Sequence, residues 1–445
     1  MGMETVQLDA IRSCLEGVIP AAVATCSAEG VPNATYVSQM QYVDARHVAL
    51  SFQFFSKTRQ NVLANPQVTA LVIDPVTAAA YRLELLYLRT ETAGALFQSL
   101  KAKLAGIASH VGMVGVFKLQ GADVYRVLRV ERVPGPELKR PPPERNLLNA
   151  LRQSGERLAA CTDLDALFDQ LLVQLAGEFG IEQALLLMAD EDGRRLFLVG
   201  SRGYASSGIG SEIQLGEGVI GVAAQYRTAI RINHMTSEYL YGSAGRGDAA
   251  PEAEIPFPGL AEPHSQLAVP ILLADRLLGV LCVESAQDLR FGYDDEDALV
   301  ALATQLGLQI ALLQQQAECG AATAMTAQAG GPVPPSSGQP LELRHYAGND
   351  SVFVAGDYLI KGVAGAILWK LVREHQAGRC EFTNRELRMA PELRLPDVSD
   401  NLEARLILLQ RRLAERCPSL AFEKTGRGQF RLCVARPLRL VEAEG

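Results

Sequence analysis

Two stretches that are poor in residues favouring helices or strands divide the chain. This division limits the fold more than any other sequence feature. Residues 133–145, VPGPELKRPPPER, are rich in proline and charge, which predicts a stiff, extended spacer. Residues 318–340, ECGAATAMTAQAGGPVPPSSGQP, are mostly Ala, Gly, Pro and Ser, a composition typical of flexible linkers. We therefore expect three domains, over residues 1–133, 145–316 and 341–440, as the length of 445 residues allows.

Composition excludes several classes of protein. No run reaches the ~20 apolar residues of a membrane span, and the N-terminus lacks the basic patch and apolar core of a secretion signal. The eight cysteines form no CxxC pair and the six histidines are separated, which argues against a metal site and against a disulfide framework. We expect a cytoplasmic protein that holds no metal and contacts no membrane.

Charge is unevenly distributed along the chain. The net charge is -8, yet the residues from Leu341 onward hold 17 Lys and Arg against 14 Asp and Glu. The last segment thus has a net charge of +3, which leaves -11 for the rest of the chain. An acidic body with a basic final segment limits any contact with nucleic acid to that segment.

The first segment contains many short strands separated by Gly, Pro, Asn and Asp, with one helix at residues 93–109, and this pattern predicts a small barrel. One of these strands runs into LSFQFFSKTRQNVLANPQV, residues 50–68, where two cations and two hydroxyls follow one another. Arg offers a planar fork of donors and Lys a point charge, so the cluster favours an anion such as phosphate. A solvated basic loop is the alternative.

This order of elements resembles the FMN-binding split barrel of the pyridoxamine 5'-phosphate oxidase family. The resemblance implies an FMN whose phosphate is held by Ser56, Lys57, Thr58 and Arg59, with Ser51 and Phe52 beside the flavin. It also implies a homodimer with the flavin at the shared interface. Family members bind FMN, other flavins, haem or nothing, and a barrel used only for dimerisation stays open. No residue is identified as a catalytic acid or base, although flavin chemistry belongs largely to the cofactor.

The second segment begins with two amphipathic helices, residues 146–161 and 163–180, and continues with strands around the motif Gly216-Glu217-Gly218 and Gly221. A hairpin through Ala268–Ile271 and Gly279–Leu281 and a closing helix follow. These features resemble a GAF domain, which implies a sheet flanked by helices that senses a small ligand or pairs with a second copy. The first and last helices, 146–161 and 298–316, either pair across a dimer or pack on their own sheet.

An insertion at residues 233–264 lies where a lid over a ligand pocket is expected. It contains candidate ligand-binding residues, namely His234, Tyr239, Tyr241, Arg246 and His264. A surface loop rich in Gly, Ala and Pro is the alternative. Cys282 lies in an apolar strand, and we expect it to be packed and inert.

The third segment reads as a hairpin at 349–362, a helix at 363–379, a capping box of Thr383 and Glu386, a long helix at 400–417 and a hairpin at 420–434. This order resembles the winged-helix effector domain of OmpR-type response regulators. The resemblance implies that residues 405–413 form the recognition helix and residues 425–432 the wing.

An exposed recognition helix with Arg and Gln can enter the major groove of DNA, and a basic wing can contact the minor groove or phosphates. The expected base-contacting residues are Arg405, Gln410, Arg411 and Arg412, with Arg427 on the wing and with Lys424 and Arg385 on phosphates. Asp397, Asp400 and Glu403 depart from this pattern because they repel phosphate unless they bond a base or cap the helix. A winged helix used for protein contact is the alternative.

The three segments together predict a multidomain α+β protein: a split β-barrel, an α/β GAF domain and a winged helix. We expect a one-component transcription regulator that senses a small cytoplasmic ligand, cofactor or redox state and binds double-stranded DNA as a homodimer. The alternative is a flavin-dependent oxidoreductase with regulatory GAF and winged-helix domains. A protein-interaction scaffold with an inactive barrel is a third possibility.

Overall fold

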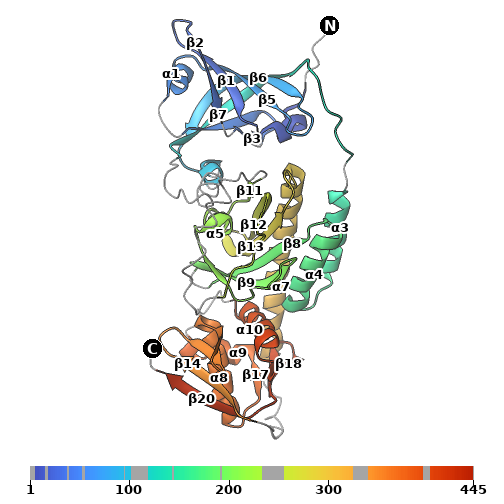
Figure 1. The fold of residues 1–445 in the computed structure, drawn as a ribbon, viewed down its shortest axis with the longest axis vertical. Helices are drawn as coiled ribbons and strands as arrows, with labels where there is room; N and C mark the ends of the chain where they lie inside the picture. Colours follow the sequence, from blue (N-terminus) through green and yellow to red (C-terminus); the bar gives the residue numbers. More distant parts are fainter. Residues whose placement is uncertain are drawn as a thin grey trace.

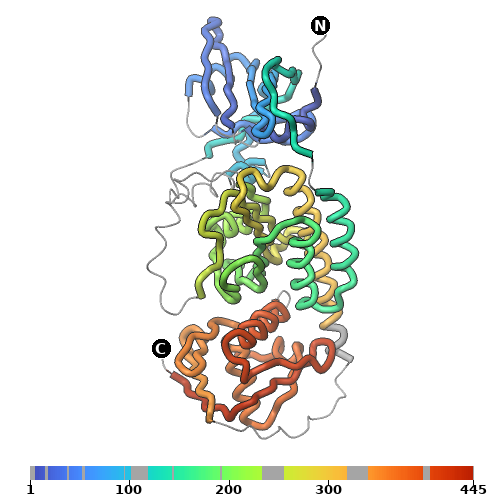
Figure 2. The backbone as a smooth tube through the Cα atoms, turned by 45° about the vertical axis from the view of Figure 1, so that its right-hand side comes forward, coloured from blue at the N-terminus to red at the C-terminus, as the bar shows by residue number. Residues whose placement is uncertain are grey.

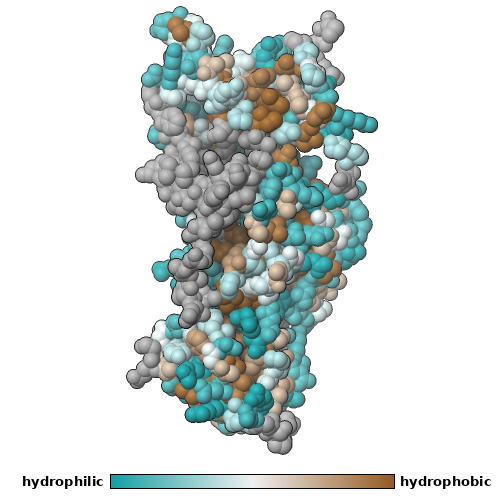
Figure 3. Space-filling view, in the orientation of Figure 1, coloured by the Kyte–Doolittle hydropathy of each residue, from teal (hydrophilic) through white to brown (hydrophobic). Residues whose placement is uncertain are grey.

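The computed structural model describes residues 6–15, 19–37, 40–52, 56–94, 96–101, 119–142, 145–190, 193–232, 255–323, 339–393 and 401–443. Three domains follow one another along the long axis of the molecule (Figure 1). We call them the N-terminal domain (6–133), the central domain (145–323) and the C-terminal domain (339–443). On the face shown in Figure 3 hydrophobic and hydrophilic side chains are mixed, with hydrophobic ones gathered on part of the N-terminal domain.

The N-terminal domain is a seven-stranded antiparallel sheet in the order β2-β1-β5-β6-β7-β4-β3. Its elements are η1 (Leu8–Leu15), β1 (Ala21–Cys26), β2 (Pro32–Val37), β3 (Met40–Asp44), β4 (His47–Phe52), α1 (Lys57–Ala64), β5 (Gln67–Ile73), β6 (Ala80–Glu91) and β7 (Gly121–Val133). In β5, Val68, Ala70 and Val72 alternate with exposed residues and enter the core. Of the helix predicted at 93–109, residues 96–101 are helical and residues 102–109 lie outside the described residues.

The central domain is a six-stranded antiparallel sheet in the order β10-β9-β8-β13-β12-β11. Its elements are α3 (Leu147–Ala159), α4 (Leu164–Gly177), β8 (Gln183–Ala189), β9 (Arg195–Arg202), β10 (Glu212–Gln214), α5 (Gly218–Tyr226), β11 (Ile230–Ile232), β12 (Ser265–Leu273), β13 (Arg276–Ser285) and α7 (Tyr293–Thr323). Helices α3, α4 and α7 lie together along one side of the sheet (Figure 2), while α5 packs on the other face. The strands are almost wholly apolar because both faces of the sheet are covered.

The C-terminal domain combines two small sheets with three helices. Its elements are β14 (Leu341–Tyr346), β15 (Ser351–Val354), β16 (Asp357–Ile360), α8 (Gly362–Gln376), β17 (Glu381–Thr383), α9 (Asn384–Arg388), η2 (Pro391–Leu393), α10 (Leu402–Arg416), β18 (Leu420–Gly426), β19 (Gln429–Val434) and β20 (Leu438–Ala443). The predicted hairpins and helices are present, and the predicted capping box of Thr383 and Glu386 is formed. Strands β14 and β20, which pair in parallel, were not predicted from the sequence.

Contacts join the domains into a continuous structure. Arg12 of the N-terminal domain forms an ion pair of 2.8 Å with Asp297 at the start of α7, and its guanidinium lies over the ring of Tyr293 at 4.6 Å. The central and C-terminal domains share one apolar core, to which α10 contributes Ile407 and Leu408. The C-terminal domain is therefore docked on the central domain.

Helix α7 is long and apolar enough, by length and composition, to span a membrane. Its apolar residues Leu302, Leu306 and Ile310 are fully buried in the core of the central domain. In this structure α7 is therefore a core helix of that domain.

Candidate functional site

The predicted phosphate cluster lies at the start of α1, at the edge of the N-terminal sheet. Ser56 caps the helix: its hydroxyl accepts a hydrogen bond of 3.4 Å from the backbone N–H of Arg59. The hydroxyl of Thr58 accepts a hydrogen bond of 2.9 Å from the Asn33 side chain, and Lys57 is exposed. Unpaired N–H groups at a helix start favour an anion, so Ser56, Lys57 and Thr58 fit a phosphate group.

Arg59 does not fit that role in this structure, contrary to the prediction. Its guanidinium turns into the domain, forms an ion pair with Asp123 and donates a hydrogen bond of 2.8 Å to Thr90. It also lies over the ring of Phe52 at 4.2 Å, and only 11% of its side chain is exposed. Burial makes this pairing obligatory, because an unpaired buried charge is costly. Ser51 sits beside Phe52 in β4, half-buried and paired with Ala122 of β7.

A buried polar cluster occupies the face of the central sheet that α5 covers. Glu284 of β13 accepts hydrogen bonds from the hydroxyl of Tyr204 (3.0 Å), the side chain of Gln266 (2.9 Å) and the backbone N–H of Leu260 (3.2 Å). Burial raises the pKa of the Glu284 carboxyl despite these three donors. Burial likewise raises the pKa of the neighbouring Cys282 thiol, as expected for a packed, inert cysteine.

Tyr204, Gln266 and Glu284 were not predicted from the sequence. They form a polar site that can hold a proton or accept a hydrogen bond from a ligand. The available signal was a polar residue inside each of two otherwise apolar strands, SQLAV and LCVES. Of the predicted ligand-binding residues, His264 lies directly before β12, and its Nδ1 is 3.2 Å from Asp288 Oδ1. The other four, His234, Tyr239, Tyr241 and Arg246, lie outside the described residues.

Helix α10 contains most of the predicted DNA contacts, and its predicted arginines are buried (Arg405 and Arg412) or half-buried (Arg411) rather than exposed. Arg405 forms an ion pair with Asp190 and lies over the ring of Phe197 at 4.6 Å. Arg411 contacts Asp165 at 2.6 Å and Asp169 at 2.7 Å, and it donates to the carbonyl of Val199 at 2.9 Å. All of these partners belong to the central domain.

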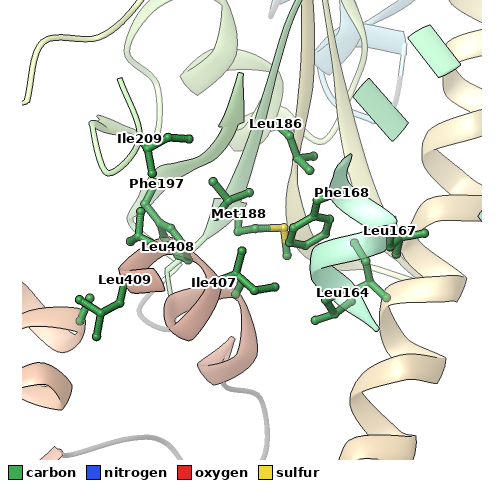
Figure 4. Close-up of a cluster of buried hydrophobic side chains, with 14 of the residues drawn as sticks. Leu164, Leu167, Phe168, Leu186, Met188, Phe197, Ile209, Ile407, Leu408 and Leu409 are labelled. Atoms are coloured by element: carbon green, nitrogen blue, oxygen red, sulfur yellow. The ribbon is translucent and has the colours of Figure 1, made fainter. Parts of the chain in front are cut away.

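Arg412 is also buried, but it points into its own domain. Its Nε donates to the carbonyl of Leu359 at 2.9 Å, and burial lowers the pKa of its guanidinium. The prediction that Arg405, Arg411 and Arg412 form an exposed face is therefore not met in this structure. The physical reason is that α10 is apolar on two sides: Ile407 and Leu408 face the central domain, while Leu409 points away from it (Figure 4).

The remaining predicted DNA contacts lie at the surface. Gln410 is exposed on α10, and Arg385 is exposed on α9. On the β18–β19 hairpin Lys424 forms an ion pair of 2.9 Å with Asp163 of the central domain, whereas Arg427 is exposed and has no polar partner among the described residues. Within the described part of the chain no three His, Cys, Asp or Glu side chains are grouped to hold a metal.

The sequences of the central and N-terminal domains each match a protein-family model. Residues 161–311 match the GAF domain family. The central domain is a GAF domain. Residues 8–125 match the pyridoxamine 5'-phosphate oxidase family, so the N-terminal domain is of that type. These two matches confirm the resemblances drawn from the first two segments, and a search of the curated proteins found no match to the chain.

Solved structures cover the GAF domain and the N-terminal domain separately. The GAF domain of an Acinetobacter phosphoenolpyruvate-protein phosphotransferase is 24% identical over 38% of this chain and 94% of that one, with a TM-score of 0.31. Free methionine-R-sulfoxide reductase from Neisseria meningitidis is 22% identical over 38% and 91%, with a TM-score of 0.31. An FMN-binding protein from Syntrophomonas wolfei is 15% identical over 29% and 86%, with a TM-score of 0.25.

Proposed function

We propose that the chain is a ligand-responsive transcription regulator whose C-terminal domain is a winged helix that binds double-stranded DNA. The order α8, β17, α9, α10, β18, β19 supports this proposal, because it places a long helix between a short helix and a hairpin, as winged helices do. This order of elements is the single observation that carries the DNA-binding part of the proposal, and the ion pairs that hold α10 on the GAF domain support its regulatory part.

In the proposed mechanism the docked state is the state with low DNA affinity. Arg405 and Arg411 are paired with Asp190, Asp165 and Asp169, and these carboxylates occupy the donors that phosphate or bases would need. Release of the C-terminal domain would expose both arginines, which would then join Gln410 and Arg427, already exposed in the docked state. A stimulus that binds the undocked state more tightly than the docked state therefore raises the affinity for DNA. The size of this increase is limited by the ratio of the stimulus's affinities for the two states.

The sensory part of the proposal rests on the first two domains. The GAF domain offers Glu284, Tyr204 and Gln266 to a small polar ligand. The N-terminal domain would hold FMN through Ser56, Lys57 and Thr58 at the start of α1. A bound flavin supplies two-electron redox chemistry to that site, and this makes a redox state one candidate stimulus.

Two further proposals follow from the same domains. We expect a cytoplasmic homodimer, in keeping with the domain types and with the two-fold symmetry of most operators. A second candidate function, a flavin-dependent oxidoreductase regulated by the other two domains, is favoured by the family match of residues 8–125.

Fluorescence anisotropy with labelled duplexes from a genomic library tests the proposal. Because Asp165 and Asp169 are partly exposed, we expect Asp165→Asn/Asp169→Asn to raise duplex affinity modestly, about two- to fivefold. Arg427→Ala should lower the affinity and reduce its salt dependence. The matched control is Arg126→Ala, which removes an exposed arginine from β7 of the N-terminal domain. Absence of duplex binding by the Asp165→Asn/Asp169→Asn variant at low ionic strength would refute the DNA-binding function.

A further inference from the structure

A cleft of about 310 Å³ lies at the junction of the GAF and C-terminal domains. The turn between α3 and α4, the start of α4 and residues 313–317 of α7 form its GAF side, and α9, α10 and the β18–β19 hairpin form the other. Its size falls in the ~300–1,000 Å³ range of small-molecule sites. Because both domains line it, the cleft exists only while the C-terminal domain is docked.

The inner wall of the cleft is apolar. It is formed by Leu164 and Leu313 from the GAF domain and by Ile407, Phe422 and Phe430 from the C-terminal domain. The rings of Phe422 and Phe430 lie 5.2 Å apart, in a tilted arrangement. Such a wall favours a flat or apolar body, since burial of apolar area and ring contacts both stabilise it.

The charged side chains that line the cleft are paired, with one exception. Asp163 is paired with Lys424, Asp165 with Arg411, and Glu403 with Arg388. Arg427 is the one charged residue lining the cleft that has no ion-pair or hydrogen-bond partner among the described residues. An anionic group beside Arg427 would complete the pairing with a charge-assisted hydrogen bond.

We propose that this cleft binds a small amphipathic carboxylate, with its apolar body between the two domains and its carboxylate on Arg427. A ligand that binds only the docked state stabilises that state in proportion to ln(1 + [L]/Kd). Such a carboxylate therefore holds the C-terminal domain on the GAF domain. The consequence for DNA rests on the proposed function above, whereas binding in the cleft does not.

Isothermal titration calorimetry on the full chain with 1-naphthoate tests the site, and 1-naphthamide serves as the uncharged counterpart. Because Arg427 is exposed, we expect naphthoate to bind about two- to fivefold more tightly than naphthamide. Arg427→Ala should weaken naphthoate by the same factor, about two- to fivefold, and leave naphthamide unchanged. Thr162→Trp, which places an indole in the cleft from the exposed turn of the GAF side, should weaken both probes at least tenfold.

Three results would overturn the cleft proposal: no saturable naphthoate binding, equal binding of the two probes, or unchanged binding by Thr162→Trp. Arg126→Ala should bind both probes like the unaltered chain. Anisotropy with duplex DNA separates the two proposals, because naphthoate should lower the duplex affinity of the unaltered chain but not that of Thr162→Trp. If the unaltered chain bound naphthoate but bound no duplex, the DNA-binding function would be refuted and the cleft proposal would stand.

Discussion

At the scale of single residues, Glu284 shows how burial sets the behaviour of an ionisable group. Three donors surround its carboxyl, and each of them favours the charged form. Desolvation outweighs them, so the pKa is raised from its ordinary value near 4.5. The folded chain therefore holds a proton on Glu284 more tightly than the unfolded chain does.

This raised pKa leads to a prediction about stability and pH. The contribution of Glu284 is fully present below about pH 4.5 and is lost as the pH rises through the raised pKa, because ionisation then costs more in the folded state. Glu284→Gln, which stays neutral, should equal the natural chain at low pH and become the more stable of the two as the pH rises. Urea midpoints of both chains between pH 4.5 and pH 8 measure the difference. A difference that does not change with pH would contradict the raised pKa.

At the start of α1 the sequence predicted the place of a residue cluster better than the direction of each side chain. The types and spacing of Ser56, Lys57 and Thr58 indicated an anion site, and the structure places all three at the first turn of the helix. The inward turn of Arg59 depends on Asp123, which is 64 positions away in the chain. A pairing at that separation has no local signal in a single sequence, and so it was missed.

At the scale of elements, glycines fix the start of α5. Gly216 and Gly218 adopt positive φ values of 85° and 60°, which favour glycine at this turn. Gly221 lies in the helix itself, where a Cβ atom would come within 2.3 Å of the backbone carbonyl oxygen of Gln214. The predicted motif of Gly216-Glu217-Gly218 with Gly221 thus lets α5 pack closely against β10.

Replacement of Gly221 by alanine tests this close approach. Helix propensity alone would stabilise the variant by up to about 1 kcal/mol. The backbone clash should prevail, and we expect a net loss of about 1–3 kcal/mol. Gly177→Ala is the matched control, since Gly177 ends α4 and a Cβ there meets nothing within 4 Å. Thermal unfolding followed by circular dichroism compares the two, and equal midpoints for both variants would disprove the packing role of Gly221.

Helices and strands were easier to predict from the sequence than the elements that pack against them. Alternation, turn residues and helix caps located most strands and helices, because those signals act within a few residues. The stretch PNATYVSQMQYVD contains two strands, β2 and β3, on opposite edges of the sheet. The long helix at 400–417 was predicted, but a helix that is apolar on two sides needs two partners, and sequence periodicity identifies neither of them.

At the scale of the whole molecule, the outward face of α7 is a candidate dimer contact. Val300, Leu308 and Leu312 are 40%, 60% and 46% exposed and recur on one side of the helix, and Leu148 of α3 is 78% exposed. Helix α3 packs beside α7 in the same chain, with Gly155 against Gln305. Packing of α7 on its own sheet, the alternative given in the sequence analysis, is also present, because its buried residues share one core with β12. We propose that the exposed apolar residues contact a second copy.

We predict that Leu308→Glu weakens a homodimer by placing a charge in its apolar contact. Light scattering after size exclusion should show a dimer for the unaltered chain and a shift toward monomer for the variant. Thr304→Glu on the same exposed side tests whether any added charge suffices, and a smaller shift is expected because threonine contributes little apolar area. A monomer at all concentrations for the unaltered chain would contradict the prediction.

The length of α7 has a consequence for the whole chain. Its first turn touches Arg12 and Leu15 of the N-terminal domain through Tyr293 and Asp297. Twenty residues further on, Leu313 and Gln316 line the cleft beside the C-terminal domain. A helix of 31 residues is about 46 Å long and rigid along its axis. In the proposed regulator, a small rotation imposed at one end of α7 would therefore be carried by the helix itself to the cleft at the other end.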